Sequence, residues 1–430
     1  MTPQSQFTVV APVTRGREDA LRELLATMTS QPGVADPDNL LVPFGNCQRL
    51  HFARLVILED PTLADTEAYG LPAAQLPVYL ALLGDCDGRS RECLADLSRR
   101  AADGLSGIFA NCEDFKEPLL DWMLAHDRPP AVSYVNWVGR TVLQIGEESA
   151  LQRALSQRVS RTPVASSAEA QRRWHDLALY VRREVSAGRL ALTPDPATPL
   201  AWRLAKCANA VLVLSGTLIA LPFLILFLPL LLLWLRRHEK TDPEICPPPD
   251  PRALLELQQL EDYDVTNQYT ALGSVKPGPF RSWLLTAVLA AIQFTCRHVF
   301  TRGHLARVQT IHFARWLVLD DGARVMFASN YDGGHQPYMD DFINKVAWGL
   351  NLVFSNGIGW PRTAWLLKQG ARREHLFKYY QRRHQIPTQV WYKAYPGLTL
   401  IDLARNHRIR EGIERAGMSD SEVAAWLQLL

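Results

Sequence analysis

The stretch "LHFARLVILED" at residues 50–60 returns as "IHFARWLVLDD" at residues 311–321. Other blocks follow both copies in the same order. "LALLGDCDG" corresponds to "MFASNYDGG", "IFANCEDF" to "VFSNGIGW", and "AVSYVNWVGRTVLQI" to "QVWYKAYPGLTLIDL". Matching blocks in one order over so long a distance indicate an internal duplication.

Each copy predicts the same series of elements. A strand (residues 7–13 or 269–275) leads through Gly16 or Gly278 into a helix. The HFAR strand, a hairpin, a strand ending in Asp-Gly, an amphipathic helix and a last strand then follow. The order β-α-β-β-α-β is that of the ferredoxin-like unit.

Two such units can bury the open faces of their sheets against each other. We therefore expect an α+β fold in which two ferredoxin-like βαββαβ repeats form a pseudo-dimeric α+β barrel, with an inserted hydrophobic membrane segment. The expected boundaries are 1–155 for repeat one, 156–206 for a helical linker, 207–237 for the membrane segment, 238–268 for a Pro-rich linker with a short helix, and 269–430 for repeat two.

The membrane segment is the most apolar part of the chain. Ala208 to Leu235 contains no charged residue. As a straight helix it would be about 42 Å long, whereas the hydrocarbon core of a bilayer is about 30 Å thick. Pro222 and Pro229 each remove a helical hydrogen bond. A re-entrant hairpin broken between these prolines is therefore expected, and a single span is the alternative.

The sides of the membrane follow from the flanks of this segment. Arg203 and Lys206 precede it, and Arg236, Arg237 and Lys240 follow it. Positive charges favour the cytoplasmic side, so both repeats are expected there, at a bacterial inner membrane. A hairpin turn inside hydrocarbon needs neighbouring chains to cover its backbone groups, which predicts a homo-oligomer.

Composition excludes several classes of function. The net charge of the 430 residues is +2 and there is no basic block, which excludes a nucleic-acid partner on electrostatic grounds. The seven cysteines are odd in number and include no C-x-x-C pair, so neither a disulfide framework nor a metal site is expected. The N-terminus lacks the pattern of a cleaved signal peptide.

Candidate site residues come from the HFAR strands, along which side chains alternate between two faces. Phe52, Arg54 and Val56 share one face, and His51, Ala53 and Leu55 share the other. Phe313, Arg315 and Leu317 share a face in the second copy. A buried Arg requires an anion or a carboxylate. Arg54 and Arg315 are therefore candidates for binding an acidic group, and the alternative is a structural ion pair with Asp87 or Asp332.

The loop Gly84–Gly88 reads G-x-x-D-G, and here the chain resembles the dye-decolourising peroxidases. The resemblance implies haem as a possible cofactor, with Asp87 assisting peroxide cleavage beside an Arg and Asp332 at the matching position. His312, His384 and Tyr392 are the candidates for cofactor binding. The alternative for both Asp-Gly pairs is a turn in which Asp caps a helix.

"VKPGPFR" (275–281), "SNYDGGHQPYMDDF" (329–342) and "SNGIGWPRT" (355–363) carry a second resemblance, to a group of bacterial membrane-associated proteins with duplicated ferredoxin-like repeats and no assigned activity. Two hypotheses follow. One is a membrane-surface oxidoreductase that uses haem on a hydrophobic small molecule. The other is a module that binds membrane lipid or a partner protein without catalysis.

Overall fold

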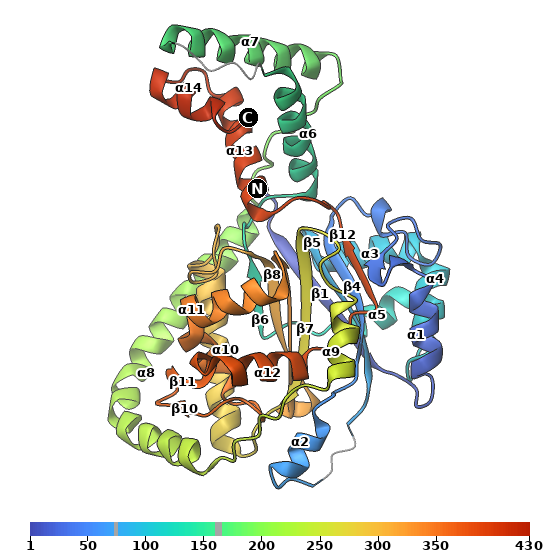
Figure 1. Ribbon diagram of the computed structural model, residues 1–430, viewed down its shortest axis with the longest axis vertical. Helices are drawn as coiled ribbons and strands as arrows, with labels where there is room; N and C mark the ends of the chain where they lie inside the picture. The colour runs from blue at the N-terminus through green and yellow to red at the C-terminus, as the bar shows by residue number, and fades with distance from the viewer. Residues whose placement is uncertain (73–75, 160–165) are drawn as a thin grey trace.

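The computed structural model describes residues 1–72, 76–159 and 166–430, so part of the predicted linker 156–206 lies outside the described residues. The fold is α+β, with two large sheets that are antiparallel apart from the pair β12–β3 (Figure 1). The first sheet has the order β1 (Gln4–Pro12), β5 (Tyr79–Asp87), β4 (Leu50–Leu58), β12 (Val390–Lys393), β3 (Gly33–Ala35) and β2 (Thr29–Gln31). The second has the order β6 (Val132–Val135), β8 (Ile311–Leu319), β9 (Arg324–Asp332) and β7 (Thr266–Ser274).

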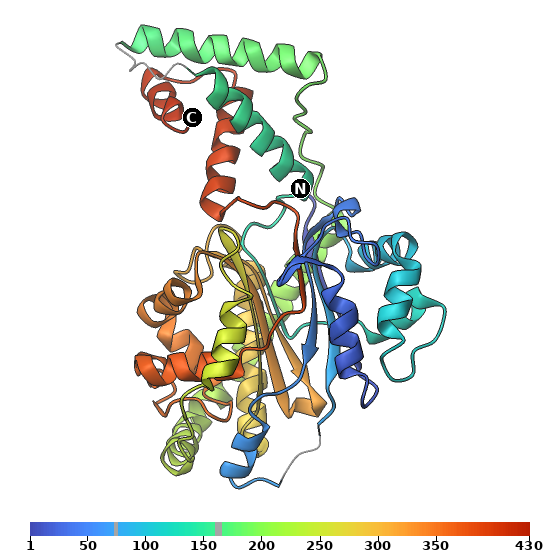
Figure 2. The ribbon, with the colours of Figure 1, turned by 45° about the vertical axis from the view of Figure 1, so that its right-hand side comes forward.

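The two sheets face each other and helices cover their outer faces. Val10, Val56 and Leu83 of the first sheet share one buried cluster with Leu272 and Leu317 of the second. The helices over the first sheet are α1 (Glu18–Ala26), α3 (Ser90–Arg100), α4 (Ala102–Phe109) and α5 (Leu119–His126). Those over the second are α10 (Pro279–His298), α11 (His335–Phe354) and α12 (Glu374–His384). The layers are therefore helix, sheet, sheet, helix (Figure 2).

The last strand of each half lies on the sheet of the other half. β6 pairs with β8, placing Val132 opposite Trp316, and β12 pairs with β4, placing Val390 opposite Leu55. Neither half therefore builds its sheet alone, which differs from the expectation of two self-contained βαββαβ units. The sequence predicts the strands themselves, but strand pairing depends on contacts that no local pattern encodes.

A helical lobe stands at one end of the sheets, beside both termini (Figure 1). It consists of α6 (Val142–Arg158), α7 (Ser167–Ser186), α13 (Leu400–Glu414) and α14 (Asp420–Leu427). Leu151, Val181, Ile409 and Trp426 contribute one residue from each helix to its core. Thr141 and Thr399 begin α6 and α13 with the same capping box. The sequence predicts a helical linker over 156–206, the range that contains α7, but not the lobe.

The remaining elements are short, with one exception. They are α2 (Leu63–Ala68), α9 (Pro251–Gln258), the hairpin β10 (Thr363–Ala364) and β11 (Lys368–Gln369), and 3-10 turns at Phe44–Asn46, Asp320–Gly322 and Gly370–Arg372. The exception is α8 (Leu200–Thr241), a helix of 42 residues.

α8 continues through both of its prolines, so the predicted break and hairpin are wrong. A proline removes one hydrogen bond and bends a helix without having to end it. Both ends of α8 contact α10. Asn209 bonds to His298 at 2.9 Å near the end of α10, and the His238 ring stacks on Phe280 near its start. Within the described residues, α8 is the one helix long and apolar enough to cross a membrane.

Candidate functional site

Arg54 projects from β4 into the interface between the sheets. Its side chain is 3% exposed. It donates only to groups of the second sheet: the carbonyl oxygens of Tyr269 and Ser329, the Thr270 hydroxyl and the Asn330 side chain. Burial, opposed by Asp85 and reinforced by Arg315, lowers the pKa of Arg54 to about 9. The guanidinium therefore stays charged at neutral pH.

Arg315 projects from β8 of the second sheet and makes the matching set of contacts with the first sheet. It is also 3% exposed. It donates to the carbonyl oxygens of Phe7 and Gly84, to the Thr8 hydroxyl, and to Asp85 at 2.5 Å. The two arginines therefore join the sheets, and each takes its partners from the sheet that it does not belong to.

Asp85 is the carboxylate that pairs with Arg315 and is linked to Arg54 through Asn330. It accepts from Arg315 directly, and its other oxygen accepts from Asn330 Nδ2 at 3.1 Å. Gln6 Nε2 donates to it at 2.8 Å. The ion pair expected with Asp87 or Asp332 is thus formed with Asp85 instead. The space lined by this group admits no water molecule, so nothing remains there for a ligand to fill.

Asp87 and Asp332 bind histidines. Asp87 accepts from His51 Nε2 at 3.0 Å and from the backbone N–H of Val142 at 2.9 Å. Asp332 accepts from His312 Nε2 at 2.7 Å and from the backbone N–H of Leu400 at 2.8 Å. Each carboxylate therefore ties the end of a strand to the first turn of a lobe helix, where a negative charge is favourable.

Both histidines occupy β-bulges. The pairing register shifts between Leu50 and Phe52, and again between Ile311 and Phe313. A bulge turns the extra residue out of the alternation. The His51 ring consequently lies 5.2 Å from Phe313 and the His312 ring 5.4 Å from Phe52, in the interface between the sheets. Period-two alternation predicted both histidines on the face opposite to Arg54 and Arg315. That prediction is wrong because each histidine lies in a bulge.

The two histidines differ in their second nitrogen. His51 Nδ1 lies 3.2 Å from the Tyr395 hydroxyl, whereas His312 Nδ1 is buried and has no hydrogen-bond partner in the described residues. Trp137 lies at the position in the first half that corresponds to Tyr395, and it stacks on Arg140 at 3.6 Å. Within the described residues Trp137 gives His312 Nδ1 no hydrogen bond.

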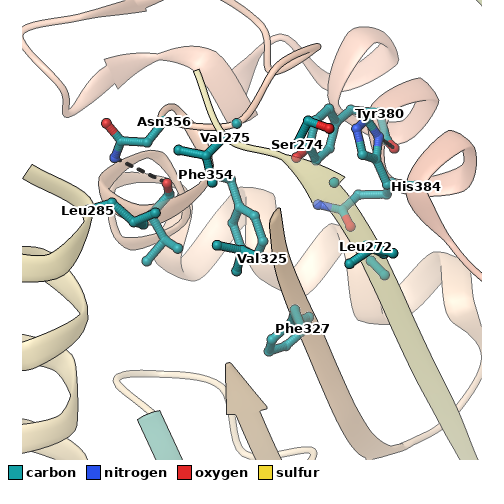
Figure 3. A pocket seen from close by; sticks show the side chains of 15 residues that line it. Leu272, Ser274, Val275, Leu285, Val325, Phe327, Phe354, Asn356, Tyr380 and His384 are labelled. Atoms are coloured by element: carbon teal, nitrogen blue, oxygen red, sulfur yellow. Dashed lines mark hydrogen bonds between the residues drawn. The ribbon is translucent and has the colours of Figure 1, made fainter. Parts of the chain in front are cut away.

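His384 lines a small pocket on the outer side of the second sheet (Figure 3). Its ring stacks on Tyr380 at 3.8 Å, and its Nδ1 is 2.9 Å from the Tyr380 carbonyl oxygen. Burial lowers the pKa of His384 and keeps it neutral. The pocket volume is about 30 Å³, far below the roughly 300–1,000 Å³ of typical ligand pockets.

The three candidates for cofactor binding are therefore not brought together. Tyr392 stacks on Phe44 in the core over the first sheet, His312 is 1% exposed between the sheets, and His384 lies outside the second sheet. Neither histidine faces a space that a porphyrin could enter. His312, His384 and Tyr392 therefore do not form a haem site together.

A larger cavity lies between α10, α11 and the outer face of the second sheet. Its volume is about 490 Å³, within the range of about 300–1,000 Å³ typical of ligand pockets. The lining is almost wholly apolar. The sequence patterns did not predict this cavity. The one hint in the sequence is that residues 283–296, in α10, are almost wholly apolar. The corresponding segment of the first half, "EDALRELLATM", is an ordinary amphipathic helix.

In comparisons with known proteins, no family model, no curated protein and no solved structure matches the chain. The function therefore has to be inferred from the geometry of the site and of α8.

Proposed function

We propose that the protein is a membrane-docked module that binds a hydrophobic molecule, without a haem reaction. The observation that carries this proposal is α8. The middle of the helix, from Val211 to Trp234, is mostly exposed, and only 6% of its most apolar window is buried. A soluble surface rarely leaves so large an apolar area in water.

The docking of α8 favours a helix that lies in one face of the bilayer. As a straight helix, Asn209 to His238 would be about 44 Å long, whereas their contacts on α10 are about 27 Å apart along that helix. The helix has to bow outward between them, as Figure 1 shows. Both ends then stay on one side of the membrane and the apolar middle enters it.

Hydrogen bonds hold the C-terminal end of α8 to the body. Glu239 is 2% exposed and accepts from the Thr363 hydroxyl and from the backbone N–H groups of Trp365 and Leu366. Asp242 accepts from Arg281 at 2.5 Å. This end is therefore a fixed anchor.

Aromatic and basic residues around α8 agree with an interfacial position. Trp234, Trp283, Trp348 and Trp365 are each about half exposed, on α8, α10, α11 and the β10–β11 hairpin. Trp gathers at the boundary between lipid and water. The basic flanks of α8 and seven free cysteines support the cytoplasmic side of a bacterial inner membrane.

The proposal includes a fused duplication of a ferredoxin-like unit, arranged as a pseudo-dimeric barrel. The matching contacts of Arg54 and Arg315, of Asp87 and Asp332, and of the two exchanged strands support it. A continuous α8 contains no turn that other chains must cover, so a homo-oligomer is no longer required to satisfy its backbone groups.

Flotation of the full chain with vesicles of phosphatidylethanolamine and phosphatidylglycerol tests the proposal. Ile219 and Leu226 on α8 are 72% and 71% exposed. Replacing both by Glu should abolish flotation, because each carboxylate costs about 2.5–3.5 kcal/mol in hydrocarbon. Ile401→Glu is the matched control, since Ile401 is 80% exposed but lies in the lobe. Equal flotation of the double variant and the control would refute membrane docking by α8.

A further inference from the structure

The cavity between α10 and α11 has a floor formed by the second sheet. Trp316 of β8 and Phe327 of β9 contribute to this floor, and Val288 and Leu350 are among the residues of the helical walls. None of the described residues that line the cavity carries a charge. An ionised group placed there would lose its water without gaining a partner, at a large cost in free energy. The cavity therefore excludes charged ligands.

The polar side chains of the floor and of α10 are not available to a ligand. Trp316 Nε1 is enclosed by protein atoms, so the indole presents only carbon atoms to the cavity. The Thr295 hydroxyl already donates to the carbonyl oxygen of Ile292 at 2.8 Å. A polar ligand would therefore find no donor on Trp316 or Thr295 to replace the hydrogen bonds that it makes with water. The ligand that this lining suits is a hydrocarbon chain.

Two small residues mark the mouth of the cavity. Ala287 and Ala291 line the cavity and are both exposed, so the space opens to the outside of α10 at these positions. They lie about two and three helical turns after Phe280, on the same face of α10, and about three and two turns before His298. Phe280 and His298 are the contacts that fix the two ends of α8 to α10. α8 therefore bows over the face that carries the mouth and leaves both alanines uncovered.

The position of α8 determines what lies against this mouth. The apolar middle of α8 is exposed, and the proposed docking places it inside the bilayer. Leu352 lines the cavity and also packs in the cluster that contains Leu235 of α8, so the cavity is continuous with the docked surface. In a docked molecule the mouth faces the acyl chains of the bilayer. This step rests on the proposed function.

We propose that the cavity takes up one acyl chain of a membrane phospholipid, which enters tail first past Ala287 and Ala291 while the headgroup stays outside. The uncharged lining sets this direction, because a charged headgroup cannot follow the chain into it. The lipid remains part of the bilayer, so an occupied cavity holds the α10–α11 face to the membrane beside α8.

Two neighbouring alanines of α10 provide a matched pair of variants. Ala291→Phe places a ring in the mouth. Ala290→Phe places the same ring at an exposed position that is not among the described residues lining the cavity. Gly349→Leu fills the space from α11, where an added Cβ meets no atom within 4 Å, so the fold should be retained.

Photolabelling of the full chain in vesicles of phosphatidylethanolamine and phosphatidylglycerol tests the proposal. The reagent is a phosphatidylglycerol with a diazirine near the end of one acyl chain, and peptide mass spectrometry locates the adducts. We expect adducts on α8, which report docking, and at Phe327 or Leu350, which report the cavity. Ala291→Phe and Gly349→Leu should each lower the cavity adducts at least tenfold and leave those on α8 unchanged, whereas Ala290→Phe should change neither. A diazirine close to the headgroup should label the mouth and not the floor.

Adducts on α8 without adducts in the cavity would overturn the acyl-chain site and keep the docking, and cavity adducts that persist in both Ala291→Phe and Gly349→Leu would also overturn the site. Cavity adducts without adducts on α8 would keep the site and remove the docking. A hexadecane that carries a diazirine, measured in parallel, separates the two sources of a hydrocarbon chain. Labelling of the cavity by this alkane and not by the phospholipid would overturn the assignment to a phospholipid.

Discussion

Asp85 and Asn330 lie at corresponding positions of the two facing sheets, and Asn330 Nδ2 donates to Asp85 Oδ2 at 3.1 Å. Each of them also accepts from the arginine of the opposite sheet. The Asp85 carboxylate thus contacts one buried guanidinium directly and the other through Asn330, and among the described residues it is the one carboxylate in this network.

Asp85→Asn should destabilise the fold by about 3–5 kcal/mol, because it leaves two buried arginines without a carboxylate. Adding Asn330→Asp to that variant moves the carboxylate to the other sheet and should restore most of the stability. Denaturant unfolding of the single and double variants measures this coupling. Simple addition of the two effects would contradict a shared network.

Arg315→Leu should cost a similar amount, about 3–5 kcal/mol, since its four acceptors, Asp85 among them, would lose their donor. Arg22→Leu is the control. Arg22 pairs with Asp19 and Glu59 at the surface, where such pairs contribute about 0–1 kcal/mol. Ligand binding by the α10–α11 cavity should not change in either variant. A loss of ligand binding in Arg315→Leu alone would show that Arg315 is part of the functional site.

Acid should weaken the fold through His335. This histidine is 2% exposed, neither ring nitrogen has a hydrogen-bond partner in the described residues, and burial lowers its pKa to about 3. The unfolded chain takes up a proton near pH 6.5, while the folded chain does not until about pH 3. The stability linked to this group is therefore complete above pH 6.5 and decreases toward pH 3, by about 2 kcal/mol at pH 5.

His335→Leu should remove that part of the pH dependence, measured by unfolding between pH 7 and pH 4.5. His175→Leu on the exposed face of α7 is the matched control. Identical pH profiles for the original chain and His335→Leu would show that His335 is not the titrating group.

Both ends of α8 should be accessible from the same side of the membrane. Cys207 is exposed near the start of the helix, and Lys240→Cys places a second thiol near its end. With Cys246 replaced by Ser, an impermeant maleimide should label neither thiol in intact spheroplasts and both after lysis. Labelling of one thiol alone in intact cells indicates a single crossing.

The sequence indicates which residues face the interface, but not how they pair. Period-two alternation correctly places Arg54 with Phe52 and Val56, because a strand has only two faces. The bulges at His51 and His312 arise from the fit between neighbouring strands and leave no local signal. The Asp-Gly pattern singles out Asp87, whereas no motif marks Asp85, two residues earlier.

Composition predicts the apolar segment of α8, but it does not predict that the segment forms one continuous curved helix. Pro222 and Pro229 suggest a break if the segment is considered alone. In the folded chain Glu239, Asp242 and Asn209 fix both ends to other elements, and one curved helix satisfies these contacts. The contacts at the two ends of α8 therefore decide whether the chain bends or reverses direction at its prolines.

Because β12 near the C-terminus pairs with β4 near the N-terminus, the first sheet cannot be completed until most of the chain has been synthesised. The backbone N–H of Ile57 on β4 donates to the Gln389 side chain, 332 residues away, and the neighbouring strand β12 follows directly. Until that segment leaves the ribosome, β4 is an open hydrophobic sheet edge, and such edges recruit other chains. The apolar α8 is also made during this interval. A nascent chain of this protein therefore needs a holding chaperone or an early membrane contact for most of its synthesis.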